Sequence, residues 1–138
     1  MSTKTKTQPF NLADFFTVPQ ASEGKLLPLK KPDGTATEYH LTVIGADAPA
    51  AKQALLAATR IIRDERNDKM SDEEKMAVSE RASLQFRVAL VTGWNLPVEF
   101  NKEAVTELLT NNPGLAQDVE QFSGDRSRFF ASVLEIGR

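Results

Sequence analysis

The apolar pattern of residues 46–138 constrains the fold more than any other feature of the chain. Apolar residues recur there every three or four positions, which is the spacing of one buried helix face. Residues typical of helix ends divide the stretch into four predicted helices. The first follows Asp47 or Ala48 with Pro49 in its first turn, and the second follows Ser71, which forms a capping box with Glu74. The pattern therefore predicts a mainly α fold.

The later helix boundaries are indicated by glycine, asparagine and proline. The second helix is expected to run to about residue 91 and to stop at Gly93 in the left-handed conformation, before a loop that begins at Trp94. Asn101 is predicted to cap a third helix, which residues 111–114 (NNPG) end. A fourth helix starts at Leu115. Residues 123–124 (Ser-Gly) break or kink it before its apolar face continues to residue 136.

The N-terminal part of the chain has a different pattern. Residues 25–44 alternate in polarity around a Pro-Asp-Gly turn and predict a β-hairpin, with Pro28 restricting the first strand to the sheet edge. Asn11 caps a predicted single helical turn that carries Phe15 and Phe16, which either dock on the domain or remain disordered. Residues 1–10 are predicted to form a flexible arm. Residues 11–138 are predicted to form a single domain of about four helices with a small N-terminal hairpin.

The rare residues exclude several classes of function. The chain has no Cys and a single His, His40, so thiolate sites and two-histidine metal sites are excluded. Seventeen Lys and Arg against 19 Asp and Glu leave a net charge of −2, which argues against nucleic-acid binding. No apolar run approaches the roughly 18–20 residues of a membrane span. We therefore predict a soluble intracellular protein without catalytic, cofactor-binding or metal-binding residues. His40 is expected to be an ordinary strand residue.

Acidic residues are concentrated at positions 64–74, and paired carboxylates are ligands that a hard cation prefers. Arginine and lysine residues are interleaved with them, and the spacing of a calcium-binding loop is absent. The segment is therefore predicted to be a solvated, charge-paired helix end and turn.

Aromatic residues are the candidates for protein interaction. Trp94 either fills the core between the second and third helices, in a cluster with Phe100 and Leu108, or anchors an interface. On a continuous last helix, Phe122 and Phe129 share one face and Phe130 lies on another. One aromatic face then remains for a partner, unless the hairpin and the Phe15–Phe16 turn cover both. The predicted interaction residues are Trp94, Leu115, Phe122, Phe129 and Phe130.

Short motifs between residues 84 and 136 point to a known family. They are residues 86–94 (FRVALVTGW), residues 96–97 (LP), residues 100–103 (FNKE), residues 108–109 (LL), Pro113 and Phe129. In these motifs the chain resembles the small tail assembly chaperones of bacteriophages with long, flexible, non-contractile tails.

The resemblance implies a non-enzymatic protein that coats the tape-measure protein, helps bring tail-tube subunits to it, and self-associates. It also implies a location in the cytoplasm of the infected bacterium, absence from the mature virion, and a possible longer form made by ribosomal frameshifting. Nucleic acid and membrane are not expected partners. The alternatives are a head–tail connector or tail-completion protein retained in the virion, a small intracellular adaptor, and a small enzyme.

Overall fold

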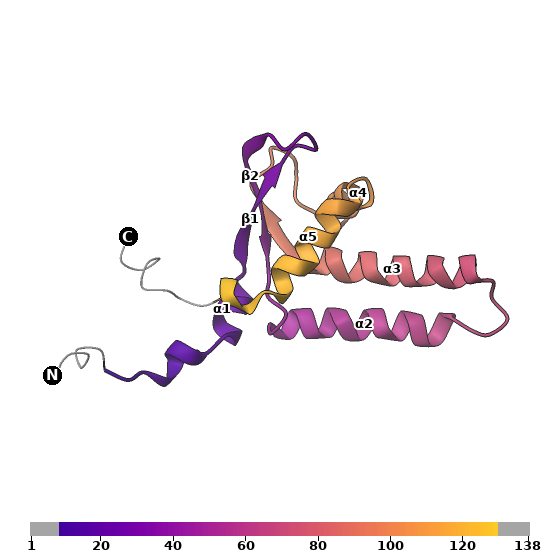
Figure 1. Ribbon diagram of the computed structural model, residues 1–138, viewed down its shortest axis with the longest axis horizontal. Coiled ribbons are helices and arrows are strands. Elements are labelled where there is room, and N and C mark those ends of the chain that lie inside the picture. The colour runs from indigo at the N-terminus through magenta and orange to yellow at the C-terminus, as the bar shows by residue number, and fades with distance from the viewer. Residues whose placement is uncertain (1–8, 130–138) are drawn as a thin grey trace.

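The computed structural model describes residues 9–129, which form a mainly helical protein with a small antiparallel sheet (Figure 1). The helices and strands in chain order are η2 (Leu12–Phe15), α1 (Val18–Glu23), β1 (Lys25–Lys30), β2 (Ala36–Val43), α2 (Pro49–Glu65), α3 (Asp72–Leu90), β3 (Val91–Trp94), α4 (Lys102–Thr110), α5 (Pro113–Gly124) and η3 (Arg126–Arg128), where η marks a 3-10 helix. The four predicted helices correspond to α2 to α5. Helix α1 was not predicted, and Pro19 lies in its first turn.

The sheet contains three antiparallel strands in the order β1-β2-β3. Strands β1 and β2 form the predicted pair, with Leu27 opposite Leu41, and β1 occupies the edge expected from Pro28. The third strand was not predicted. Strand β3 follows α3 directly and pairs with β2, with Trp94 opposite Leu41.

The predicted left-handed helix end at Gly93 is wrong. Gly93 lies within β3, where it pairs with Thr42, and the glycines with positive φ in the described part of the chain are Gly24 and Gly34. Helix α3 instead ends at Leu90, and the next residue already has extended backbone. The reason is long-range: hydrogen bonding to β2 stabilises an extended chain at a position where local sequence favours a helix cap.

The predicted helix caps are confirmed. Ala48 precedes α2, with Pro49 in its first turn. In the capping box of α3, the Ser71 hydroxyl accepts from the Glu74 amide at 3.1 Å, and the Glu74 carboxylate accepts from the Ser71 amide at 2.8 Å. The Asn101 side chain accepts from the amide of the third residue of α4. The Ser71 and Asn101 side chains satisfy amide groups that their helices leave unpaired, whereas Ala48 makes no side-chain cap hydrogen bond.

The last helix breaks at residues 123–124, where the sequence predicts a break or kink. Helix α5 ends at Gly124, and η3 leads the chain back so that Phe129 packs edge-on against Phe122 with ring centroids 5.7 Å apart. The expectation that these two residues share a face of one continuous helix is therefore wrong. The turn is held by Ser123, whose buried hydroxyl donates to the Ile44 carbonyl at 2.8 Å.

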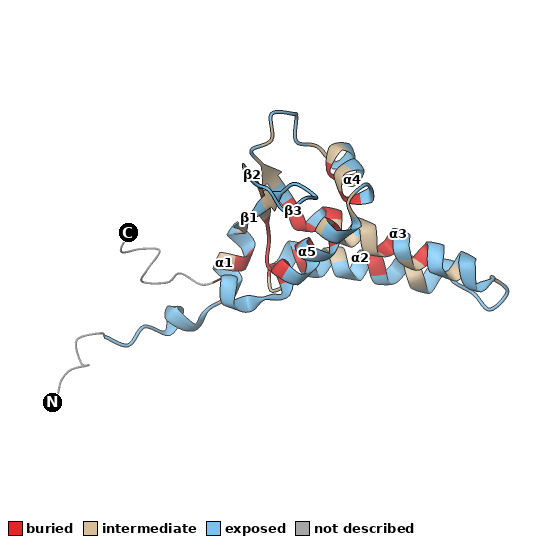
Figure 2. Cartoon of the chain, turned by 45° about the horizontal axis from the view of Figure 1, so that its top comes forward, coloured by how far each residue is buried: buried red, intermediate tan, exposed pale blue. Residues whose placement is uncertain are grey.

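The molecule consists of a packed body and a projecting helical hairpin. Helices α2 and α3 lie antiparallel, and their far ends extend well beyond the sheet, α4 and α5 (Figure 1). Burial is concentrated where α3 meets the sheet, α4 and α5, whereas the far part of the hairpin is largely exposed (Figure 2). The largest fully buried side chains are Leu41, Val43, Leu90, Val105, Leu109, Val119 and Phe129.

Candidate functional site

Trp94 connects the sheet to the loop before α4. Its ring is half-buried and meets Phe100 edge-on, with centroids 5.2 Å apart, and its indole N–H donates to the Val98 carbonyl at 3.0 Å. The Trp94–Phe100 pair of the predicted cluster is therefore confirmed, and Leu108 packs, half-buried, against the hydrophobic core. A half-buried tryptophan with a satisfied N–H stabilises this loop while leaving part of its ring accessible.

The other predicted interaction residues differ in accessibility. Phe122 and Phe129 are core residues, and Leu115 is half-buried at the start of α5. Phe130 lies outside the described residues. Leu115 is therefore accessible at the surface, whereas Phe129 is enclosed in the core. The role of these residues in binding remains a prediction.

Leu115 and Phe122 line a groove between the β1–β2 hairpin and α5, which we term the sheet–α5 groove. It consists of two hollows of about 300 and 420 Å³ that share Leu27 and Asp118. Leu27, Leu115 and Phe122 supply its apolar surface. The groove therefore combines apolar and charged side chains, as a surface for an amphipathic helix requires.

The edge of the sheet–α5 groove carries both signs of charge. The Arg128 guanidinium lies 4.8 Å from the centre of the Phe122 ring, a cation–π distance, and also pairs with Asp125 at 3.2 Å. The Ser127 hydroxyl donates to Asp125 at 2.6 Å and is the main cause of the lowered pKa of that carboxyl. Lysines 30 and 31 line the other end of the groove.

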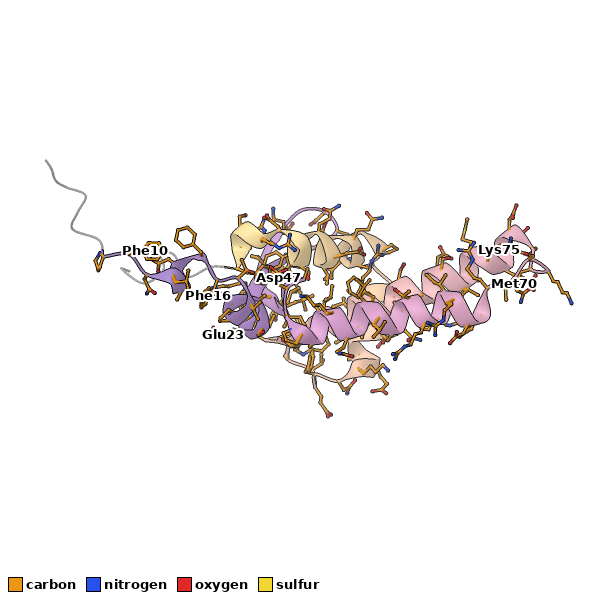
Figure 3. The ribbon with its side chains drawn as sticks, turned by 90° about the horizontal axis from the view of Figure 1, so that it is seen from below. Phe10, Phe16, Glu23, Asp47, Met70 and Lys75 are labelled. Atoms are coloured by element: carbon orange, nitrogen blue, oxygen red, sulfur yellow. The ribbon has the colours of Figure 1, made fainter. Side chains whose placement is uncertain are left out.

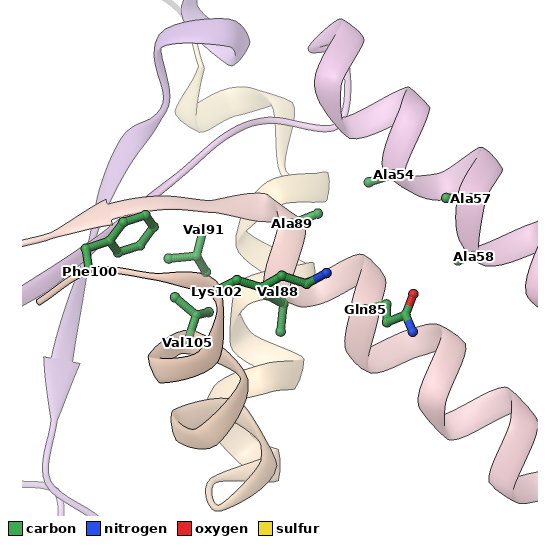
Figure 4. Close-up of a pocket in the computed structure, with 10 residues that line it drawn as sticks. All are labelled: Ala54, Ala57, Ala58, Gln85, Val88, Ala89, Val91, Phe100, Lys102 and Val105. Atoms are coloured by element: carbon green, nitrogen blue, oxygen red, sulfur yellow. The ribbon is translucent and has the colours of Figure 1, made fainter.

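A second groove, which we term the alanine groove, lies where α2, α3, β3 and the start of α4 meet (Figure 4). Its volume is about 410 Å³. Four of its lining residues are alanines, Ala54, Ala57 and Ala58 on α2 and Ala89 on α3. Because an alanine side chain ends at Cβ, the facing helices leave space that longer side chains would fill. The groove therefore follows directly from the choice of residues on α2.

The remaining lining of the alanine groove is also mostly apolar. Buried Val88, Val91 and Val105 come from three different elements and form its floor. The Phe100 ring, which is 38% exposed, and the Lys102 side chain flank the floor at the start of α4 (Figure 4). Such an apolar concave surface with one cation suits an apolar segment that carries a negative charge.

The N-terminal residues present the most exposed aromatic side chains of the described chain. We term residues 10–18 the aromatic segment, whose large apolar side chains are all exposed: Phe10, Leu12, Phe15, Phe16 and Val18. The predicted turn is confirmed as η2, with the Asn11 side chain accepting from the Ala13 amide. Phe10 and Phe15 stack on each other at 6.0 Å. In Figure 3 Phe10 and Phe16 lie at one end of the molecule, and Met70 and Lys75 at the other.

Asp47 anchors the aromatic segment to the body. Its carboxylate accepts a hydrogen bond from the Thr17 hydroxyl at 2.6 Å and two from the Arg126 guanidinium at 2.8 and 2.9 Å. Arg126 first, and Thr17 second, lower the pKa of Asp47 to about 2. One carboxylate thus joins the end of the aromatic segment, the start of α2 and η3.

Residues 9–129 contain no group of three or more His, Asp or Glu side chains arranged to hold a metal ion. Their helices also include none that is long and apolar enough to cross a bilayer. The His40 backbone is paired through Asn95, whose side chain accepts from the His40 amide at 2.7 Å and donates to the Glu38 carbonyl. His40 Nδ1 is buried without a hydrogen-bond partner among the described residues.

Sequence reasoning missed both grooves. On α2, Ala54 is half-buried, Ala58 is buried and Ala57 is exposed. The signal that marks a groove is the absence of any large residue among these positions. Recognising it requires knowing which element lies opposite, which the sequence alone does not reveal.

Comparison with known proteins identifies the family. A family model described as phage tail assembly chaperone matches residues 24–122, which span the elements from β1 to most of α5. Searches of curated proteins and of solved structures gave no significant match. The matched region includes all residues of the alanine groove and most of the sheet–α5 groove. The chain therefore belongs to the phage tail assembly chaperone family.

Proposed function

We propose that this protein is a non-enzymatic chaperone that binds the tape-measure protein and helps bring tail-tube subunits to it during phage tail assembly. The observation that carries the proposal is the family match over residues 24–122. It covers the alanine groove and most of the sheet–α5 groove. In this role the chain acts in the cytoplasm of the infected bacterium and is released before the virion is complete.

The sheet–α5 groove is the proposed site for the tape-measure protein. A tape-measure protein is a long helical client, and an amphipathic helix binds by placing its apolar face into a groove. Leu27, Leu115 and Phe122 provide the apolar contact, and the charges of Asp118 and Arg128 flank it. Mixed charges at the edge orient the client helix and contribute to specificity more than to affinity.

Self-association is the second part of the proposed function. A client much longer than this chain requires many copies to cover it. A chaperone of this size therefore covers its client only by binding side by side. The structure offers a second concave surface, the alanine groove, which is separate from the proposed client site. The two binding activities are therefore separable by mutation.

A co-expression experiment tests client binding. The full chain is expressed with a tagged fragment of the tape-measure protein of the same phage, and capture of the chain by the tag is measured. We expect Leu115→Asp to reduce capture at least about tenfold, since a buried charge at an interface costs more than 1.4 kcal/mol. Leu26→Asp is the matched control, because Leu26 lies on β1 outside this groove and is 55% exposed.

The outcomes separate the site from the function. If Leu115→Asp is captured at the wild-type level and its circular dichroism is unchanged, the client binds outside the sheet–α5 groove. No capture of the wild-type chain would refute tape-measure binding itself. Analysis of purified virions separates chaperone from connector, since a connector or tail-completion protein is retained in the particle. Detection of the chain there in stoichiometric amount would favour the connector.

A further inference from the structure

The body leaves the large apolar side chains of the aromatic segment exposed. Five of the 11 exposed large apolar residues within residues 9–129 lie in it, and η2 contains no buried residue. Exposed apolar clusters of this kind mark interaction sites, because their exposure to water is unfavourable. Thr17 holds the segment at its end through Asp47, and the segment leads away from the body (Figures 1 and 3). The segment is therefore available to another molecule.

The alanine groove has the size and chemistry to receive such a segment. Its volume of about 410 Å³ is open where the alanines of α2 face α3 and α4. This falls within the range of roughly 300–1,000 Å³ typical of ligand pockets. Its floor of valines suits aliphatic and aromatic side chains, and the Phe100 ring at the rim offers an edge or face to an incoming phenylalanine.

The charges of the two surfaces are complementary. Asp14 is the single charged residue between positions 9 and 18, and Lys102 is the single charged residue among those lining the alanine groove. Asp14 stands next to Phe15 in η2, so insertion of Phe15 carries the carboxylate to the groove rim. A cation at the rim of an apolar groove favours this segment over a neutral one.

We propose that the aromatic segment of one copy of this chain occupies the alanine groove of a second copy. Each copy then offers one segment and accepts one, so the contact is head-to-tail and builds an open chain or a ring of copies. The inference deepens the self-association in the proposed function. It does not depend on the identity of the client, because neither surface belongs to the sheet–α5 groove. An array of this kind presents the sheet–α5 grooves repeatedly along a client.

Mixing two association-deficient variants tests the proposal. The segment variant Phe10→Ser/Phe15→Ser retains the groove, and the groove variant Ala57→Glu retains the segment. Both replace exposed residues, so folding is preserved, which circular dichroism checks. Mass is measured by light scattering at rising concentration without any client. We expect the wild type to exceed a dimer, each variant to remain monomeric, and an equal mixture to stop at a 1:1 dimer, because one compatible pair of surfaces remains.

The controls and contrary outcomes identify other occupants. Leu26→Ser removes an apolar side chain that is 55% exposed and lies outside both surfaces, and this variant is expected to associate as the wild type does. A wild-type chain that stays monomeric would overturn the proposal. This includes a monomer in which the aromatic segment occupies the alanine groove of the same copy. Association that survives the segment variant would also overturn it, and would indicate another occupant such as residues 130–138. Since no client is present, these results stand apart from the capture experiment.

A charge exchange tests the predicted orientation. Asp14→Lys and Lys102→Asp should each weaken association by about two- to fivefold, the range of an exposed ion pair, and the double variant should recover most of the loss. Two single variants that associate as the wild type does would refute the pairing of Asp14 with Lys102.

Discussion

The body and the aromatic segment use the same amino acid in opposite ways. In the body, Phe129 is 1% exposed and packs edge-on against Phe122, so its ring contributes to the free energy of folding. In the aromatic segment, Phe15 is 73% exposed and stacks on Phe10, which is itself exposed. Burial of a phenylalanine stabilises whichever contact removes it from water. Phe129 therefore stabilises the fold, whereas Phe15 is free to stabilise an association.

The close fit around Phe129 sharpens this contrast. A Cβ added at Gly45 would lie 2.8 Å from the Ala21 Cβ and 3.0 Å from the Phe129 Cγ, so only glycine leaves room for the ring. The aromatic segment shows no comparable constraint, since none of its large side chains is enclosed. Tight complementarity in one region and exposure in the other predict different responses to mutation.

The largest expected effect is that of Phe129→Ala on folding stability. Removal of a fully buried phenylalanine ring leaves a cavity and costs about 3–5 kcal/mol. Chemical denaturation by urea measures the change as a lower midpoint. A loss below about 1 kcal/mol would show that the ring is not enclosed as the structure places it.

Trp94→Ala tests an intermediate case. The ring is half-buried and its N–H is bonded to Val98, so we expect a smaller loss of about 1–3 kcal/mol. A fully buried core tryptophan would cost more, as the sequence-based core interpretation implies. An unchanged urea midpoint together with lost client capture would instead support the role of Trp94 as an interface anchor.

Asp47→Asn tests the anchor between the two regions, and its effect depends on pH. The folded-state pKa of Asp47 is about 2, below its ordinary value of 3.8. The carboxylate therefore contributes stability that is fully present above about pH 4 and is lost as the pH falls through 2. We expect the variant to lose about 1 kcal/mol at neutral pH, since solvent around Arg126 screens the pair.

Denaturation curves at several pH values check the direction of this pH dependence. The stability difference between wild type and Asp47→Asn should be constant from neutral pH down to about pH 4 and should shrink below it. A stability difference that grows as the pH falls would contradict the stabilising role of the ionised Asp47 carboxylate. The same variant should also leave the Phe129 region folded, because the ring packing does not involve the carboxylate.

The smallest expected effect on stability is that of Phe15→Ser. Replacement of an exposed residue away from the core typically changes the free energy of unfolding by less than about 0.5 kcal/mol. Thermal unfolding at low concentration measures this. The same substitution should lower association at high concentration, and a large loss of stability with unchanged association would reverse the contrast between the two regions.

The sequence alone determined the features that depend on neighbouring residues. The Ser71–Glu74 capping box starts α3, and Asn101 starts α4. In both cases a side chain satisfies a backbone amide group three positions away. Pro28 assigned β1 to a sheet edge, because proline lacks an amide hydrogen. The motifs of residues 84–136 also indicated the family that the comparison confirmed.

Only the tertiary structure decided the features that depend on distant partners. Gly93 is extended rather than left-handed because β2, about 50 positions earlier in the chain, pairs with it. The chain turns back after Gly124 because Ser123 bonds to Ile44 and Phe129 finds room beside Gly45. The alanines of α2 form a groove because α3 and α4 lie opposite them. Local sequence specifies a backbone preference, but burial, strand pairing and concave surfaces arise from segments that meet only in the folded chain.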